Sequence, residues 1–408
     1  MHIMKKLVNW FYSSKPLLLL ITFTIFGAQS EESNEYPISE KIQRVEQFLN
    51  ESEKKGFSGA VLVSYKGTVL LKEAYGYADR KAKIPATTDM VYDTGSLTKQ
   101  FTAAGILQLV KEGKLSTDDT LAQFFNNLPE DKKRITLHQL LTHSSGISRY
   151  SSCKEDFDCI EMEPDEFFRK TFSTKLKFES GSKYEYANVG YSILGRVIEL
   201  VSKEEYEAFL NRVFFKPLGM TQTGYLLPDW GQPLYPKSYR FGKVQDDKYD
   251  TYIPKYQNAN KVAWTLKANG GIHTTLSDMN KWMSALANHD VLTEELINLL
   301  TYKHVQIGTS DNRFYGYGWT AFNTRQPKIE FVRHGGSNGF FSSNVIWQKD
   351  EEQLQVIIHS NQSFKHVSAV PTQIVNIWHR PEYSPIQFKK SFWGPLYKCI
   401  WPVVKVFV

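Results

Sequence analysis

The most informative segment of the chain is DTGSLTKQF, residues 93–101. It places Ser96 at the start of a predicted helix and Lys99 one turn later. Residues three apart on a helix share a face, so the Lys99 amine can reach the Ser96 hydroxyl and accept its proton. The positive end of the helix dipole stabilises negative charge near the serine. The pattern predicts a nucleophilic serine beside its proton acceptor.

Predicted helices and strands lie on both sides of this segment. After the serine, apolar residues recur at helical spacing and a glycine follows, which predicts a helix over residues 98–113. Before it, two β-branched apolar runs at residues 59–64 and 68–75 are separated by Tyr-Lys-Gly and predict a hairpin. An amphipathic helix is predicted over residues 38–55. A sheet therefore begins before the serine, and a helix follows it.

Strands return near the C-terminal end. Four alternating segments precede a predicted helix at residues 370–378, and they cover residues 316–322, 329–333, 342–348 and 354–360. Residues 115–300 form mostly short helical stretches broken by Gly and Pro. We therefore predict an α+β fold: an antiparallel sheet built from the N- and C-terminal segments, flanked by helices, with an inserted, mainly helical subdomain.

Ser-x-x-Lys alone is a weak signal, and its specificity comes from five further stretches. They are ITLHQLLTHSSGI (135–147), FESGSKYEYANVGYSILGRVIE (178–199), PLGMT (217–221), GGIHTTLSDM (270–279) and RHGGSNGFF (333–341). In this order the chain resembles the superfamily of β-lactamase-related serine hydrolases and penicillin-binding proteins. The resemblance is to the branch with class C β-lactamases, D-alanyl-D-alanine carboxypeptidases and esterases. It extends from about residue 40 to about residue 380 and implies a β-lactamase/transpeptidase-like fold.

The resemblance implies roles for a second motif. Tyr186-Ala187-Asn188 matches the Tyr-x-Asn motif of the family. By that match, Tyr186 shuttles a proton near the nucleophile and Asn188 contacts an amide of the substrate. The pKa of a phenol in water is ~10, so Tyr186 acts as a base only if Lys99 or another cation stabilises its phenolate.

The third motif departs from the family pattern. His334, Gly335 and Gly336 stand where the family usually has Lys-Thr-Gly. A histidine is charged only part of the time near neutral pH, so we expect weaker β-lactam hydrolysis with the acylation machinery intact. The two glycines leave room for substrate beside the strand. The resemblance also implies an oxyanion hole made by the backbone amides of Ser96 and Ser337.

The predicted function is an exported serine hydrolase that works through an acyl-enzyme on Ser96. It would cleave amide or ester bonds of D-amino-acid peptides or small esters. Its partners would be small peptide, ester or β-lactam substrates, and no metal or organic cofactor is expected. The alternatives are a β-lactamase, and a penicillin- or cell-wall-peptide-binding protein with little turnover.

Composition and the chain ends give further expectations. The net charge of +6 is spread along the 408 residues without a basic helix, so nucleic-acid binding is not expected. Residues 1–30 have the basic opening, apolar run and small-residue site of a signal peptide, which predicts a periplasmic or other extracytoplasmic location. An uncleaved membrane anchor is the alternative. Residues 38–380 would form the hydrolase domain.

The tail and the cysteines leave choices open. Residues 381–408 mix aromatic side chains with lysines, which suits either contact with a membrane interface or packing against the domain. Cys153 and Cys159 either close a short surface loop or remain free thiols, and Cys399 has no sequence-evident partner. Three cysteines exclude a disulfide scaffold, and no metal-type spacing of Cys and His occurs.

Overall fold

The computed structural model describes residues 36–148, 162–225, 235–239, 257–258, 261–323, 329–338, 340–362 and 367–385. The chain divides into two compact units, Met1–Pro37 and Ile38–Val408, and the second contains all the elements described below. The predicted signal peptide, the three cysteines and the tail beyond residue 385 lie outside the described residues.

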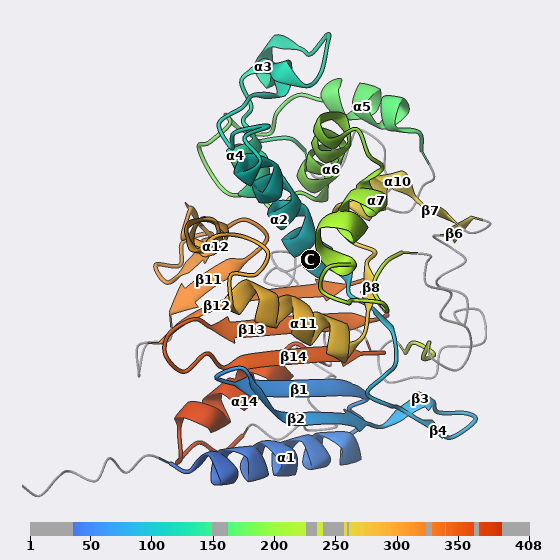
Figure 1. Ribbon diagram of the computed structural model, residues 1–408, viewed down its shortest axis with the longest axis vertical. Coiled ribbons are helices and arrows are strands. Elements are labelled where there is room, and N and C mark those ends of the chain that lie inside the picture. The colour runs from blue at the N-terminus through green and yellow to red at the C-terminus, as the bar shows by residue number, and fades with distance from the viewer. Residues whose placement is uncertain are drawn as a thin grey trace, which may run out of the picture. The chain divides into compact units, whose positions relative to one another are not determined.

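The second unit is built on an eight-stranded antiparallel sheet with the order β2-β1-β14-β13-β12-β11-β10-β9 (Figure 1). Its strands are β1 (Gly59–Tyr65), β2 (Thr68–Tyr75), β9 (Val305–Gln306), β10 (Arg313–Tyr315), β11 (Thr320–Asn323), β12 (Glu330–Ser337), β13 (Ser342–Gln348) and β14 (Gln355–Ser360). Strand β1 pairs with β14 and sets Ala60 opposite His359. The sheet is thus assembled from N- and C-terminal segments, and the predicted fold class is confirmed.

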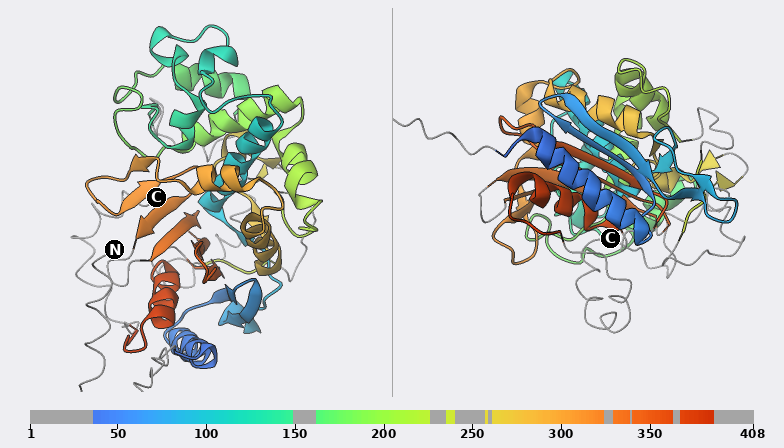
Figure 2. Two further views of the ribbon diagram at one scale, coloured as in Figure 1. Left: turned by 60° about the vertical axis from the view of Figure 1, so that its left-hand side comes forward. Right: turned by 90° about the horizontal axis from the view of Figure 1, so that it is seen from below.

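One face of the sheet is covered by two helices from opposite ends of the unit. Helices α1 (Ile38–Lys54) and α14 (Val370–His379) pack side by side there (Figure 2). Their apolar faces form one hydrophobic cluster with the sheet, in which Leu49 and Trp378 are fully buried. The hairpin between β1 and β2 turns at Lys66 and Gly67, whose φ angles of 49° and 77° suit a two-residue turn.

The other face carries α11 (Leu276–Ala287) and the helical subdomain, which form a second cluster with the sheet (Figure 1). Helix α2 (Thr98–Lys111) is its centre, and α6 (Asn188–Ser202) packs against it. The other helices are α3 (Glu130–Lys133), α4 (Leu137–Leu141), α5 (Pro164–Phe172), α7 (Tyr206–Leu210), α10 (Trp264–Lys267) and α12 (Glu294–Thr301), with short helices η1 (Gly95–Leu97), η2 (Leu121–Gln123) and η4 (Asn211–Phe215).

Three two-stranded sheets complete the elements. They are β3 (Tyr77–Asp79) with β4 (Ile84–Pro85), β5 (Tyr92–Asp93) with β8 (His273–Thr274), and β6 (Gln257–Asn258) with β7 (Lys261–Val262). The second pair matters for the site, because β5 leads directly into η1. Within the ranges given above, no helix is long and apolar enough to cross a membrane.

Two predicted strands have different bounds in the structure. The prediction for residues 316–322 is partly wrong, because Gly316 and Gly318 belong to the turn between β10 and β11. A Cβ on Gly316 would lie 2.7 Å from the Leu300 carbonyl oxygen, and one on Gly318 would lie 2.7 Å from that of Lys99. The strand predicted to end at residue 333 continues to Ser337 and therefore includes the His-Gly-Gly motif.

Candidate active site

Ser96 lies in η1, between the end of β5 and the start of α2. Gly95 has a φ of +52°, a left-handed conformation that turns the chain sharply before the serine. Ser96 is partly exposed, whereas Gly95 and Leu97 on either side are buried. The turn therefore presents the serine hydroxyl while its neighbours fix the backbone.

The side-chain nitrogen of Lys99 lies where the sequence predicted, beside the serine. Its Nζ atom is 3.1 Å from Ser96 Oγ and also donates to the backbone oxygen of Asn269 at 2.5 Å. The Asn269 side chain is itself held, because its Nδ2 atom donates to Ser192 Oγ and to the Thr265 oxygen. The Lys99 side chain is fully buried. A fixed carbonyl thus aims the amine at the hydroxyl.

Tyr186 borders the same amine. The Lys99 Nζ atom lies 5.0 Å from the centre of the Tyr186 ring. The ring of His143 packs on Tyr186 with 4.2 Å between centroids, and His143 Nδ1 accepts a hydrogen bond from the Ala187 amide at 3.2 Å. Asn188 begins α6 and is partly exposed. His143 therefore positions the tyrosine motif from the end of α4.

His334 lies on β12 and is buried. Its Nδ1 atom is 2.8 Å from the Gly335 carbonyl oxygen, which only an N–H can satisfy, so Nε2 accepts from the Tyr315 hydroxyl at 3.0 Å. Burial, together with the nearby positive charge of Lys99, lowers the pKa of His334 to about 3. The expectation of a partial charge near neutral pH is therefore wrong, because desolvation keeps this imidazole neutral.

Gly336, the second glycine after His334, allows close contact between β12 and η1. A Cβ on Gly336 would lie 1.8 Å from the Thr94 oxygen and 2.7 Å from the Ser96 nitrogen. A Cβ on Gly95 would lie 2.5 Å from the Ser337 nitrogen. We call this contact between residues 94–96 and 336–337 the glycine seam. It brings the backbone amides of Ser96 and Ser337 together, as an oxyanion hole requires.

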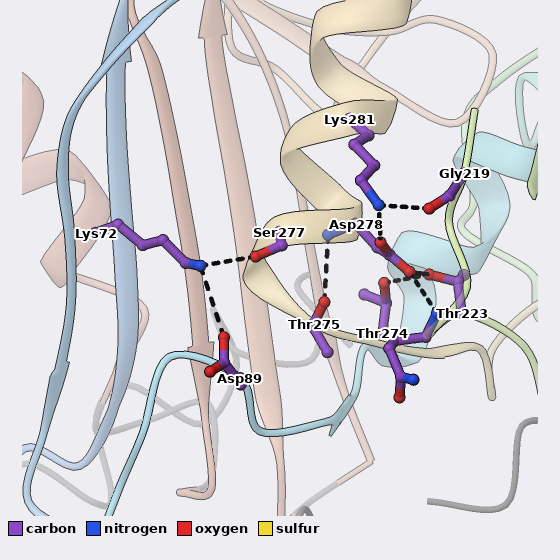
Figure 3. A network of polar contacts seen from close by, with 10 residues as sticks. Lys72, Asp89, Gly219, Thr223, Thr274, Thr275, Ser277, Asp278 and Lys281 are labelled. Atoms are coloured by element: carbon purple, nitrogen blue, oxygen red, sulfur yellow. Dashed lines mark hydrogen bonds and ion pairs between the residues drawn. The ribbon is translucent and has the colours of Figure 1, made fainter.

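A polar network supports β8, the strand that pairs with β5 (Figure 3). The carboxylate of Asp278 accepts from the Gln222 amide at 2.7 Å, from Thr223 Oγ1 at 3.0 Å and from Lys281 at 2.8 Å. Thr223 also bonds to Thr274 Oγ1 of β8 at 2.6 Å. The network joins the start of α11 to β8 and so supports the segment that leads to the serine.

The structure brings Ser96, Lys99, Tyr186 and the 334–337 segment together, places Asn188 at the start of α6, and adds other residues. Tyr315 was missed because nothing near it in sequence marks a contact with His334. The Asn269 contact uses a backbone carbonyl, which leaves no side-chain signal. His143 lies in the recognised stretch at residues 135–147, so the sequence already indicated a supporting place beside the site. Among the described residues, no three His, Cys, Asp or Glu side chains are grouped as a metal site would require.

Comparison with known families agrees with this geometry. A family model described as Beta-lactamase matches residues 42–375. Penicillin-binding protein 4* of Bacillus subtilis is 26% identical over 322 residues, which cover 76% of this chain and 69% of the relative. Protein flp of Staphylococcus aureus is 25% identical over 372 residues, or 86% of this chain and 70% of the relative.

Solved structures share the fold. An octameric penicillin-binding protein homologue from Pyrococcus abyssi superposes with a TM-score of 0.68 at 24% identity, covering 82% of this chain and 77% of that one. D-amino acid amidase from Ochrobactrum anthropi SV3, complexed with D-phenylalanine, gives 0.69 at 20% identity, covering 83% of this chain and 98% of that one. These two likenesses establish the fold.

Proposed function

Because the chain belongs to the beta-lactamase family of serine hydrolases, we propose that it hydrolyses amides or esters through an acyl-enzyme on Ser96. The observation that carries this proposal is the 3.1 Å contact between Lys99 Nζ and Ser96 Oγ, next to the glycine seam. A nucleophile with an adjacent base and two convergent amides is what acyl transfer needs.

The acylation step uses these groups in order. Lys99, as the neutral amine, takes the Ser96 proton while Oγ attacks the carbonyl carbon of the substrate. The carbonyl oxygen becomes an oxyanion and accepts hydrogen bonds from the amides of Ser96 and Ser337. When the intermediate collapses, the leaving amine or alcohol receives the proton from Lys99 through Tyr186, and the acyl group remains on Oγ. Asn188 lies at the start of α6, where it can bind the substrate amide.

Deacylation reverses the proton movement. Water attacks the acyl carbon and gives its proton to the Lys99–Tyr186 pair, and Ser96 Oγ leaves and is reprotonated. The product is a carboxylic acid. Lys99 is again a neutral amine and Ser96 again a hydroxyl, so the site is ready for the next cycle.

For the substrate class, we propose D-amino-acid amides, peptides or small esters that present no carboxylate to β12. The family's usual lysine offers a positive charge at this position, whereas His334 is neutral because burial lowers its pKa to about 3. Both of its nitrogens are also engaged, by Tyr315 and Gly335. The amidase among the structural neighbours fits such substrates. Penicillins, which carry a carboxylate, are the second candidate because of the penicillin-binding relatives.

We further propose that residues 1–30 direct export, that residues 38–380 act outside the cytoplasm, and that residues 389–408 contact a membrane surface. The proposal rests on the signal-like and aromatic-basic sequences. Fractionation of cells expressing the full chain and a chain lacking residues 389–408 tests the tail. Equal partition of both into the soluble fraction would reject membrane contact.

The function is tested by mass spectrometry of the intact protein and by steady-state rates. The protein is incubated with D-phenylalanine amide, D-alanyl peptides, p-nitrophenyl esters or a labelled penicillin, with Ser96→Ala as the control. We expect Ser96-dependent turnover of amides or esters and slow reaction with penicillin. A long-lived penicillin adduct without turnover would favour the binding-protein alternative, and Ser96-independent hydrolysis would overturn the mechanism.

A further inference from the structure

We infer that the Asp93 carboxylate and the Asn338 side chain form a positioning clamp that sets the distance between the two oxyanion amides. The inference rests on the proposed acyl-transfer function. Asp93 is the last residue of β5 and lies two residues before Gly95. Asn338 directly follows Ser337. The two side chains therefore lie next in sequence to the two segments that form the glycine seam.

The clamp spans the seam with three groups. Asp93 Oδ1 accepts from the Gly95 amide at 2.7 Å, and Asp93 Oδ2 accepts from Asn338 Nδ2 at 2.6 Å. One carboxylate thus holds the backbone just before Ser96 and the side chain just after Ser337. Asp93 is 6% exposed, so water competes little for these bonds.

The orientation of Asn338 is fixed by its other end. Its Oδ1 atom accepts from the amides of Phe340 at 3.0 Å and Phe341 at 2.8 Å. Rotating the amide by half a turn would cost both of these bonds, so Nδ2 must face Asp93. Ser337 is tied to the same turn, because its Oγ donates to the Phe341 oxygen at 2.9 Å. Asn338 is therefore held at both ends, by Asp93 on one side and by the amides of Phe340 and Phe341 on the other.

The clamp acts on the nucleophile through geometry. Both oxygens of Asp93 accept hydrogen bonds, one from the Gly95 amide and one from Asn338 Nδ2. Oxyanion donors work only when they are held in place before the charge develops. Releasing the clamp should therefore slow the chemical step and leave substrate binding nearly unchanged.

The hydrogen-bond pattern gives a swap test. In Asp93→Asn the new amide cannot accept from Asn338 while it also accepts from Gly95, so two N–H groups oppose each other. In Asn338→Asp two carboxylates oppose each other. In the double variant Asp93→Asn/Asn338→Asp every bond has a donor and an acceptor again: residue 93 accepts from Gly95 and donates to residue 338, which still accepts from Phe340 and Phe341.

Steady-state kinetics with a p-nitrophenyl ester measures the effect. We expect kcat to fall ~10²-fold in each single variant, with KM changed less than about threefold, and the double variant to recover to within about tenfold of the native chain. The Asn338→Asp deficit should shrink on acidification relative to the native enzyme, because two facing carboxylates then share a proton. Native turnover and its loss in Ser96→Ala are measured first, so that failure of the proposed function is recognised separately.

Glu199→Gln is the matched control. Glu199 is a buried carboxylate of α6 that accepts from the Tyr206 amide and from Trp264 Nε1, away from the seam. The Glu199→Gln variant should have a lower melting temperature than the native protein, without the loss of kcat expected for the Asp93 and Asn338 variants. Unchanged kcat in the single variants, or a folded double variant that stays as slow as they are, would overturn the clamp. If Asp93→Asn does not fold, the double variant and the pH profile of Asn338→Asp decide alone.

Discussion

The glycine seam makes a sharp prediction at Gly336. In Gly336→Ala the new Cβ would start 1.8 Å from the Thr94 oxygen, while real Cβ contacts stay above 3.0 Å. The seam must therefore widen by about 1.2 Å, because neither partner is a flexible side chain. Displacement of about 1 Å at a reacting geometry costs ~10²-fold in rate, and loss of one oxyanion donor costs ~10²–10³-fold.

We therefore expect kcat of Gly336→Ala to fall by ~10²–10³, equivalent to ~3–4 kcal/mol of transition-state stabilisation. The extra atom should also destabilise the fold by ~1–3 kcal/mol through overpacking. The assay is hydrolysis of the best amide or ester substrate, run at a temperature where circular dichroism shows the variant to be folded. KM reports whether substrate binding survives.

Gly190→Ala provides the control for the same substitution. Gly190 lies within α6, and its new Cβ would lie 3.5 Å from the Leu140 oxygen, an ordinary contact. Gly190 is the third residue of α6, in its first turn, so alanine there should stabilise the protein by at most ~0.5–1 kcal/mol relative to glycine and leave the rate unchanged. A folded Gly336→Ala protein with kcat within tenfold of the native value would refute the assignment of this seam to the oxyanion hole.

Three further predictions concern the base, the buried histidines and Tyr315. Lys99→Met should lower kcat by at least ~10³-fold with the fold intact, measured by burst kinetics, since it removes the amine that contacts Ser96 Oγ. Burial lowers the pKa of His359 to about 3 and of His304 and His379 to about 4. Between these values and 6.5 the unfolded chain binds protons that the native chain does not. The free energy of unfolding should therefore fall as the pH drops from 6.5, by roughly 1 kcal/mol per pH unit for each such histidine. His359→Gln should flatten the slope in urea titrations, unlike the exposed His289→Gln, and an equal slope in both would contradict this account. Tyr315→Phe should cost ~1–3 kcal/mol of stability by leaving Nε2 of buried His334 unsatisfied, and an unchanged melting temperature would argue against that bond.

Sequence patterns predicted the elements whose residues carry their own periodicity. Helices α1 and α14 and the β1–β2 hairpin appeared where helical spacing, alternation and a Tyr-Lys-Gly turn indicated them. The sequence does not predict the turn at residues 316–319. Its glycines are required because the backbone of Leu300 and of Lys99, far away in sequence, leaves no room for a Cβ atom. Local patterns contain no record of such tertiary contacts.

In the candidate active site, too, local spacing predicted some contacts, whereas others depend on tertiary packing. Ser96 and Lys99 are one helical turn apart, so their contact followed from spacing. The neutrality of His334 did not, because it depends on burial and on a hydroxyl from another strand. Asp93 and Asn338 lie in two of the recognised stretches, at residues 93–101 and 333–341. They are 245 positions apart, and only the folded chain shows that they form a hydrogen bond.

The pairing of β1 with β14 has a consequence for biosynthesis. Ala60 and His359 are neighbours in the sheet but are separated by about 300 positions along the chain. A growing chain contains Ser96 in η1 and Lys99 in α2 long before β12 supplies the Ser337 amide and β14 supplies the partner of β1. Contacts of such long range form late and slowly. Under the proposed mechanism, the nascent chain would therefore carry Ser96 without the second oxyanion amide, and we expect it to stay inactive until β12 and β14 are made.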